Sequence, residues 1–174
     1  GDNSNLILDP DLDSYYLMDA FVNKLPGISE SVDELGILGV KTIAENKANL
    51  EFDRVAFSEH YGAAENNHKS MENGFRTAFD NNPSLIPEIE PLFKKCAGNM
   101  NAFLNMINTG LLSGQGLGAD LAGFYSSYSD TAGGIFSLYE RGHFACMHGM
   151  HAAVGFGGGE EQGRIIGFLY VMIG

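Results

Sequence analysis

Basic residues are scarce in this sequence. It has 10 Lys and Arg against 22 Asp and Glu, which gives a formal net charge of -12 at pH 7. A surface this acidic repels phosphate backbones, so the charge argues against a nucleic-acid-binding protein. It argues equally against docking on an anionic lipid surface by charge alone.

Tryptophan is absent, and there are only two cysteines, Cys96 and Cys146. They form neither a C-x-x-C pair nor a dense disulfide framework. Two buried thiols are one interpretation, and a single disulfide in an oxidising compartment is the other. The core must be built from 12 Phe, 7 Tyr, 7 Met and the aliphatic residues, in a chain of 174 residues that is long enough for one domain.

Alternating strand patterns are missing from most of the chain, and apolar residues recur at helical spacing instead. The clearest pattern is a heptad seam in steps of four and three, which predicts a long helix packed at a shallow angle. Its members are Phe57, Tyr61, Ala64, His68, Met71, Phe75 and Ala78. The seam ends at Asn81-Asn82-Pro83, where Ser84 or the preceding Asn is expected to cap the next helix. That helix carries an apolar stripe of Ile86, Ile89, Leu92, Phe93, Cys96, Met100, Phe103, Leu104, Ile107 and Leu111.

At the N-terminal side, Asp9-Pro10-Asp11 predicts a helix start, and this helix should end near Lys24, before Pro26-Gly27. A further helix is expected from Ser29, with a bend or a break around Gly36 and Gly39. A last helix follows the turn at residues 113–116. Its predicted apolar face consists of Leu121, Phe124, Tyr125, Tyr128, Ala132, Ile135, Phe136 and Tyr139.

The pattern predicts an all-α fold, an up-and-down helical bundle of the four-helix type, over residues 1–141. Residues 142–174 contain nine glycines, so we expect an irregular segment there. The apolar run Ile165–Ile173 at its end is either a buried element or the beginning of a membrane span, for which nine residues alone are too few.

Four residues near the N-terminus are candidates for a ligand site: Asp13, Tyr15, Tyr16 and Asp19. Their spacing allows acidic and phenolic groups to share one side of a helix, where they would hold an amine-bearing or polyhydroxyl ligand. The alternative is that the acids cap the helix and the tyrosines belong to the core. Asp19 lies beyond the first turn, so it needs a partner if it is buried.

His68 occupies a core position of the heptad seam. It is either a ligand-binding or pH-sensing group or a histidine hydrogen-bonded within the core.

The tract Cys146-Met147-His148-Gly149-Met150-His151 offers soft and imidazole ligands, but its spacing matches no zinc signature. No phosphate-binding loop and no nucleophile motif is present in the sequence. We therefore expect no enzyme activity, no metal and no cofactor.

The segment from Asn5 to Asp19, NLILDPDLDSYYLMD, is long and specific, and Lys24-Leu25-Pro26 follows it. These residues resemble the extracytoplasmic sensory region of bacterial methyl-accepting chemotaxis proteins and of some sensor histidine kinases. The phrase AFDNNP at residues 78–83 and the rhythm between residues 120 and 139 are weaker parts of the same resemblance, which covers residues 5–140. The chain departs from the family after residue 139, where residues 142–164 are either a true insertion or a disturbance of the reading frame.

The resemblance implies a periplasmic domain of an inner-membrane receptor that is anchored by flanking transmembrane helices. Such a domain senses a small-molecule ligand, works as a homodimer and performs no chemistry. It implies a chemotaxis receptor in the first place and a sensor histidine kinase as the alternative. A metal-binding bundle and a purely structural bundle are further hypotheses.

Overall fold

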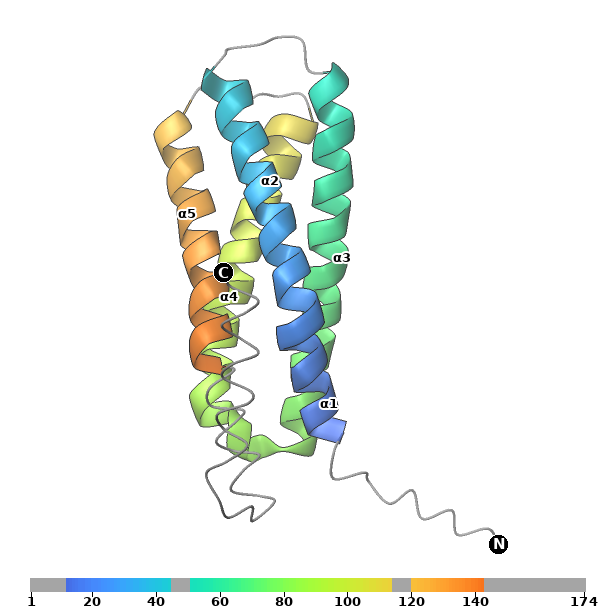
Figure 1. Cartoon of the computed structure of the whole chain (residues 1–174). Helices are drawn as coiled ribbons and strands as arrows, with labels where there is room; N and C mark the ends of the chain where they lie inside the picture. Colours follow the sequence, from blue (N-terminus) through green and yellow to red (C-terminus); the bar gives the residue numbers. More distant parts are fainter. Residues whose placement is uncertain (1–11, 45–50, 114–119, 143–174) are drawn as a thin grey trace, which may run out of the picture.

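The computed structural model describes residues 12–44, 51–113 and 120–142 of the chain. These residues form four long helical rods that run alternately up and down, which confirms the predicted all-α bundle (Figure 1). The first rod consists of α1 (Leu12–Met18), the π-helical turn η1 (Asp19–Lys24) and α2 (Leu25–Ala44), and the second is α3 (Glu51–Asn81). The third consists of the 3-10 turn η2 (Pro83–Leu85), α4 (Ile86–Met106) and the π-helical turn η3 (Ile107–Leu112). The fourth consists of α5 (Leu121–Ser137) and η4 (Leu138–Gly142).

Rods that follow one another in the sequence are neighbours in the bundle. α2 lies between α3 and α5, and α4 packs against both of these helices on the other side (Figure 1). Among the described residues, no helix combines the length and the apolar character that crossing a membrane requires.

The first rod passes through Pro26 without interruption, so the predicted helix end near Lys24 and the new start at Ser29 are wrong. The Leu25 N–H donates to the carbonyl of Ala20, which is the bond of a widened turn. Proline lacks an N–H, and its ring collides with the carbonyl one α-helical turn earlier. The wide turn η1 ends two residues before Pro26. Its wider spacing leaves room for the proline ring, so the helix continues through Pro26 to the end of α2.

Gly36 and Gly39 do not break α2, contrary to the prediction. Both are buried on the side of α2 that faces α5. A Cβ atom at Gly36 would lie 2.6 Å from Cδ2 of Tyr128, and a Cβ at Gly39 would collide with the ring of Phe124. The two glycines therefore allow two aromatic rings of α5 to lie directly against the backbone of α2.

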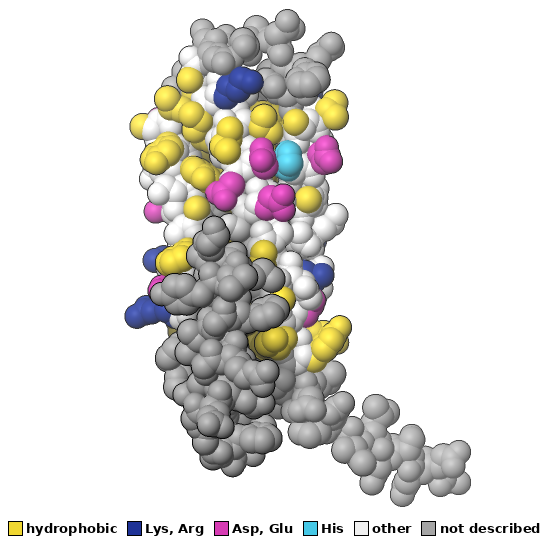
Figure 2. All heavy atoms as spheres, in the orientation of Figure 1, with side chains coloured by type: hydrophobic (Ala, Val, Ile, Leu, Met, Phe, Trp, Pro, Cys, Tyr) yellow, Lys and Arg dark blue, Asp and Glu magenta, His cyan; other side chains and the backbone are white. Residues whose placement is uncertain are grey.

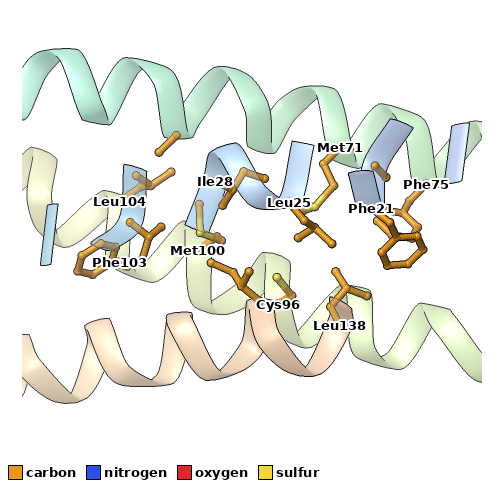
Figure 3. Packing of buried hydrophobic residues seen from close by; sticks show 14 of the residues in the cluster. Phe21, Leu25, Ile28, Met71, Phe75, Cys96, Met100, Phe103, Leu104 and Leu138 are labelled. Atoms are coloured by element: carbon orange, nitrogen blue, oxygen red, sulfur yellow. The ribbon is translucent and has the colours of Figure 1, made fainter. Parts of the chain in front are cut away.

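The core runs along the bundle axis and receives side chains from all four rods (Figure 3). The predicted seam of α3 is confirmed, because all of its members are buried except Tyr61, which is half-buried. Phe75 of this seam meets Phe21 edge-on, with ring centroids 5.6 Å apart, and lies 4.7 Å from the centroid of Phe93. These aromatic contacts join the first three rods.

The apolar stripe of the third rod is also confirmed. Seven of its predicted members are buried and Ile86, Leu92 and Phe93 are half-buried. The side chain of Asn82 accepts a hydrogen bond from the Ser84 N–H at 3.2 Å, so the preceding Asn caps the 3-10 turn η2 with which this rod begins. Cys96 is a free, buried thiol, and its burial raises its pKa to about 12.

The predicted apolar face of the fourth rod is partly wrong. Phe124 and Ile135 are buried as expected, but Tyr125 is 58% exposed and Phe136 is 63% exposed. Thr131 is fully buried instead, and its Oγ1 lies 2.8 Å from the Ser127 carbonyl oxygen. Burial follows the four-and-three spacing along the helix, and the polar hydroxyl is accommodated because it finds a backbone acceptor.

The surface over α2 carries acidic side chains around its middle and hydrophobic side chains toward its upper end (Figure 2). The predicted irregular segment lies outside the described residues, except for Gly142, which ends η4. The interpretations of Cys146, His148, His151 and Ile165–Ile173 therefore stay predictions.

Candidate ligand-binding cavity between α3 and α4

The structure does not gather the four N-terminal candidate residues around one point. Asp13 lies in α1, but its side chain is outside the described part of the structure. Tyr15 is 66% exposed, whereas Tyr16 is half-buried against the core. The two rings meet edge-on, with centroids 5.6 Å apart. The tyrosines thus divide between surface and core.

Asp19 has partners close to it in the sequence. Its Oδ1 accepts a hydrogen bond from Asn23 Nδ2 at 2.8 Å, and its Oδ2 lies 3.9 Å from Lys24 Nζ. Its side chain is 31% exposed, so water also reaches the carboxylate. The partner that Asp19 was expected to need if buried is therefore supplied by its own rod.

His68 is the predicted site residue that lines a cavity. The residue is only 2% exposed, and neither ring nitrogen has a hydrogen-bond partner among the described residues. Glu72, one helical turn later, places Oε1 3.5 Å from Nε2, which is too long for a well-formed hydrogen bond. His68 is therefore buried in the core, as one of the two interpretations expected, but it has no well-formed hydrogen bond at either ring nitrogen among the described residues, and the side chain of Asn101 is the amide that acts on it.

The cavity lies at the interface between the second and third rods and has a volume of about 190 Å³. His68 and the buried Leu104 contribute apolar surface to it. The α3 side adds Tyr61, Glu65, Lys69 and Glu72, and the side of α4 and η3 adds Asn101, Asn105 and Asn108. One wall is thus charged, and the other consists of carboxamides, each of which can donate and accept hydrogen bonds.

The charged wall has one unbalanced carboxylate. Glu65 is paired with Lys69, whose Nζ lies 3.1 Å from Oε1. Burial lowers the pKa of His68, and the Glu72 carboxylate and Asn101 side chain oppose this without reversing it. The imidazole is therefore neutral at pH 7, and Glu72 faces no described cation.

Burial also raises the pKa of Tyr61, and the Glu65 carboxylate acts in the same direction, so the phenol keeps its proton at pH 7. The cavity therefore offers a hydroxyl, a neutral imidazole, three carboxamides and a net negative charge. Leaving the imidazole nitrogens unpaired costs about 1–3 kcal/mol, so a bound group that pairs with them gains affinity.

A second depression of about 300 Å³ lies between α4 and α5 and includes Asn99, Ser127 and Asp130. Its main donor is already used, because Asn99 Nδ2 donates to the Asp130 carbonyl oxygen at 2.7 Å. In the described ranges no three His, Cys, Asp or Glu residues converge as metal ligands would. The α3–α4 cavity thus differs from this depression in combining charged side chains, an imidazole and three carboxamides around one space.

The three asparagines of the cavity were not predicted from the sequence. A signal for them exists, because Asn101, Asn105 and Asn108 follow steps of four and three along one side of the third rod. That polar stripe lies beside the apolar stripe and marks a part of the helix that faces another rod without joining the core.

Comparisons of the chain with protein-family models, with curated proteins and with solved structures found no match.

Proposed function

We propose that this chain is the small-ligand-sensing domain of a transmembrane chemoreceptor and that its ligand binds in the α3–α4 cavity. The observation that carries the proposal is His68, a buried side chain on a cavity with both ring nitrogens unpaired. Natural cores pair their buried polar groups, and an exception at a cavity points to a functional group.

Signalling would follow from the position of the cavity. Its walls belong to two rods that run in opposite directions, so a ligand that contacts both walls favours one arrangement of α3 and α4 over another. Small displacements of long packed helices are a common means of transmitting such a preference along a bundle. This mechanism needs differential binding and no covalent chemistry.

The resemblance of residues 5–140 to chemotaxis receptors supports the cellular context. It implies a periplasmic location, an anchor in the inner membrane and a homodimer. The proposal therefore includes self-association of the domain, which sedimentation velocity measures directly. A purely monomeric boundary at high protein concentration would contradict the dimer and leave the cavity to be tested separately.

The experiment is a thermal-shift screen of the purified chain against amino acids, organic acids, amines and sugars. Ligand at ten times its Kd stabilises the folded state by about 1.4 kcal/mol, which corresponds to a few degrees in Tm for a domain of this size. We expect at least one class to raise Tm. Asn105→Trp, which fills the cavity from its exposed carboxamide wall, should abolish the shift.

The matched control is Asn66→Trp. This asparagine is exposed on α3 and does not line the cavity, so the variant should keep the full shift. A ligand shift that survives Asn105→Trp would place the site elsewhere in the chain. No shift with any class would contradict the sensing function.

A further inference from the structure

The unbalanced charge of the cavity selects among small polar molecules. We propose that the α3–α4 cavity binds a small primary amine in its protonated form, with the ammonium group held between the Glu72 carboxylate and the imidazole of His68. This inference rests on the proposed function and adds the chemical class of the ligand.

The position of the ammonium follows from two groups that approach each other without forming a well-formed hydrogen bond. Glu72 Oε1 and His68 Nε2 are 3.5 Å apart, and Glu72 has no described cation beside it. An ammonium group has three donors and no acceptor, so it can donate to a carboxylate and to an imidazole lone pair at the same time. Donors of this charge form the shorter and stronger kind of hydrogen bond with a carboxylate.

The cavity walls beyond Glu72 and His68 fit the uncharged part of a small amine. A methylene chain can lie over the buried side chain of Leu104, and a hydroxyl or amide at the far end can pair with Asn105 or Asn108. A volume of about 190 Å³ suits a compound somewhat larger than benzene, which fills a cavity of roughly 150 Å³. The volume therefore favours a small molecule over a large one as the part that enters the cavity.

The negative charge around the cavity disfavours anionic ligands. Two carboxylates and one lysine line the cavity, and the whole chain has a formal net charge of -12. An organic anion would have to approach this field and displace Glu65 from Lys69, whose Nζ lies 3.1 Å from Oε1. A cation is drawn toward the same field.

The test uses three probes of similar shape and different charge, which are ethanolamine, ethylene glycol and glycolate. Each is titrated into the purified chain by calorimetry at pH 7. We expect saturable binding of ethanolamine, and affinities at least 10-fold weaker for the neutral diol and for the anion. Glu72→Gln keeps the size of the side chain and removes its charge, and it should weaken ethanolamine binding by roughly 10-fold or more.

Glu59→Gln is the control, because Glu59 is exposed on the same helix and does not line the cavity. This variant has the same change in net charge and should bind ethanolamine like the wild type. Equal weakening by both variants would reduce the effect to general electrostatics and overturn the proposal. Imidazole NMR signals of His68 that do not move on addition of ethanolamine would overturn it as well.

The outcomes separate this inference from the proposed function. If another class in the screen stabilises the chain, Asn105→Trp abolishes that effect and ethanolamine does not bind, the cavity is a sensing site and the amine assignment is wrong. If the full screen, ethanolamine included, produces no effect, both the sensing function and the amine assignment fail.

Discussion

The hydroxyl of Tyr128 on α5 donates a hydrogen bond of 2.9 Å to Oδ1 of Asp33 on α2. The ring of the same tyrosine lies against Gly36, where no side chain intervenes. One residue of the fourth rod therefore holds the first rod by a polar contact at its tip and by an apolar contact along its ring.

Replacing Tyr128 by Phe should remove the polar contact and keep the apolar one. We expect the free energy of unfolding to fall by about 1 kcal/mol, the usual net contribution of such a bond. Urea denaturation at pH 7 measures the change. Tyr125→Phe is the control, since Tyr125 is exposed and should change stability by less than about 0.5 kcal/mol.

The same residue predicts a dependence on alkaline pH. Burial raises the pKa of Tyr128 above 10, and the bond to Asp33 acts in the same direction. Because the folded state binds this proton more tightly than the unfolded state, the stabilisation is fully present below pH 10 and is lost as the pH rises through the raised pKa. The difference in stability between the wild type and Tyr128→Phe should therefore shrink on going to alkaline pH. A constant difference would contradict this account.

Two glycine-to-alanine substitutions should have opposite effects. Gly39→Ala forces a methyl group into the ring of Phe124 and should destabilise the chain by about 1–3 kcal/mol. Gly98→Ala adds its methyl group in open space on an exposed part of α4. The better helix propensity of alanine should then stabilise the chain by about 0.5–1 kcal/mol. Thermal unfolding of both variants tests the pair, and equal effects would show that α5 does not pack on Gly39.

His68 predicts a dependence on acidic pH. Its pKa is lowered in the folded state, mainly by burial, so its contribution to stability is present above about pH 6.5 and is lost as the pH falls through the lowered pKa. The titratable groups around it in the cavity are Tyr61, Glu65, Lys69 and Glu72 of α3, while α4 and η3 present Leu104 and carboxamides.

Replacing His68 by Phe removes this titration and the two unpaired nitrogens. Wild type should lose stability relative to this variant by up to about 1.4 kcal/mol per pH unit in that range. At pH 7 the variant should be at least as stable as the wild type, because no polar atom remains unpaired at this position. Denaturant titrations at several pH values check both statements. Parallel stability profiles of the two proteins would show that the histidine does not titrate differently on folding.

Asp19→Asn tests the N-terminal candidate site against the cavity. The carboxylate is partly exposed, and its described partners are Asn23 and Lys24. A surface ion pair of this kind contributes little, so stability should change by less than about 0.5 kcal/mol. Any ligand-induced thermal shift should remain as in the wild type. Loss of the shift in a well-folded Asp19→Asn protein would move the site back to the first rod.

The sequence predicted those parts of the fold that depend on spacing along one helix. The seam of α3, the apolar stripe of α4 and the cap at Asn82 arise from residues within a few turns of one another, and all three are confirmed. The helix end before Pro26 and part of the apolar face of the fourth rod were local errors, and a further error concerns residues whose role depends on another rod. Gly36 and Gly39 resemble helix breakers until the rings of α5 are placed against them.

The candidate site was predictable only in part for the same reason. His68 was found because a histidine stands out in an apolar seam, but its unpaired state depends on which side chains of α4 face it. Asn101, Asn105 and Asn108 become part of a site only when the third rod is packed against α3. Helical spacing gives the side of a helix on which residues lie, but it does not give the opposite wall.

The wide turn η1 has a mechanical consequence. Leu17, Phe21 and Leu25 are spaced four and four, and the surplus residue in the turn keeps all three in the core. The first rod therefore continues through Pro26 as one uninterrupted helical member of about 50 Å at 1.5 Å per residue, from Leu12 to Ala44. A hinge at the proline would absorb an axial displacement applied at one end of this rod. Without such a hinge, the displacement reaches the opposite end.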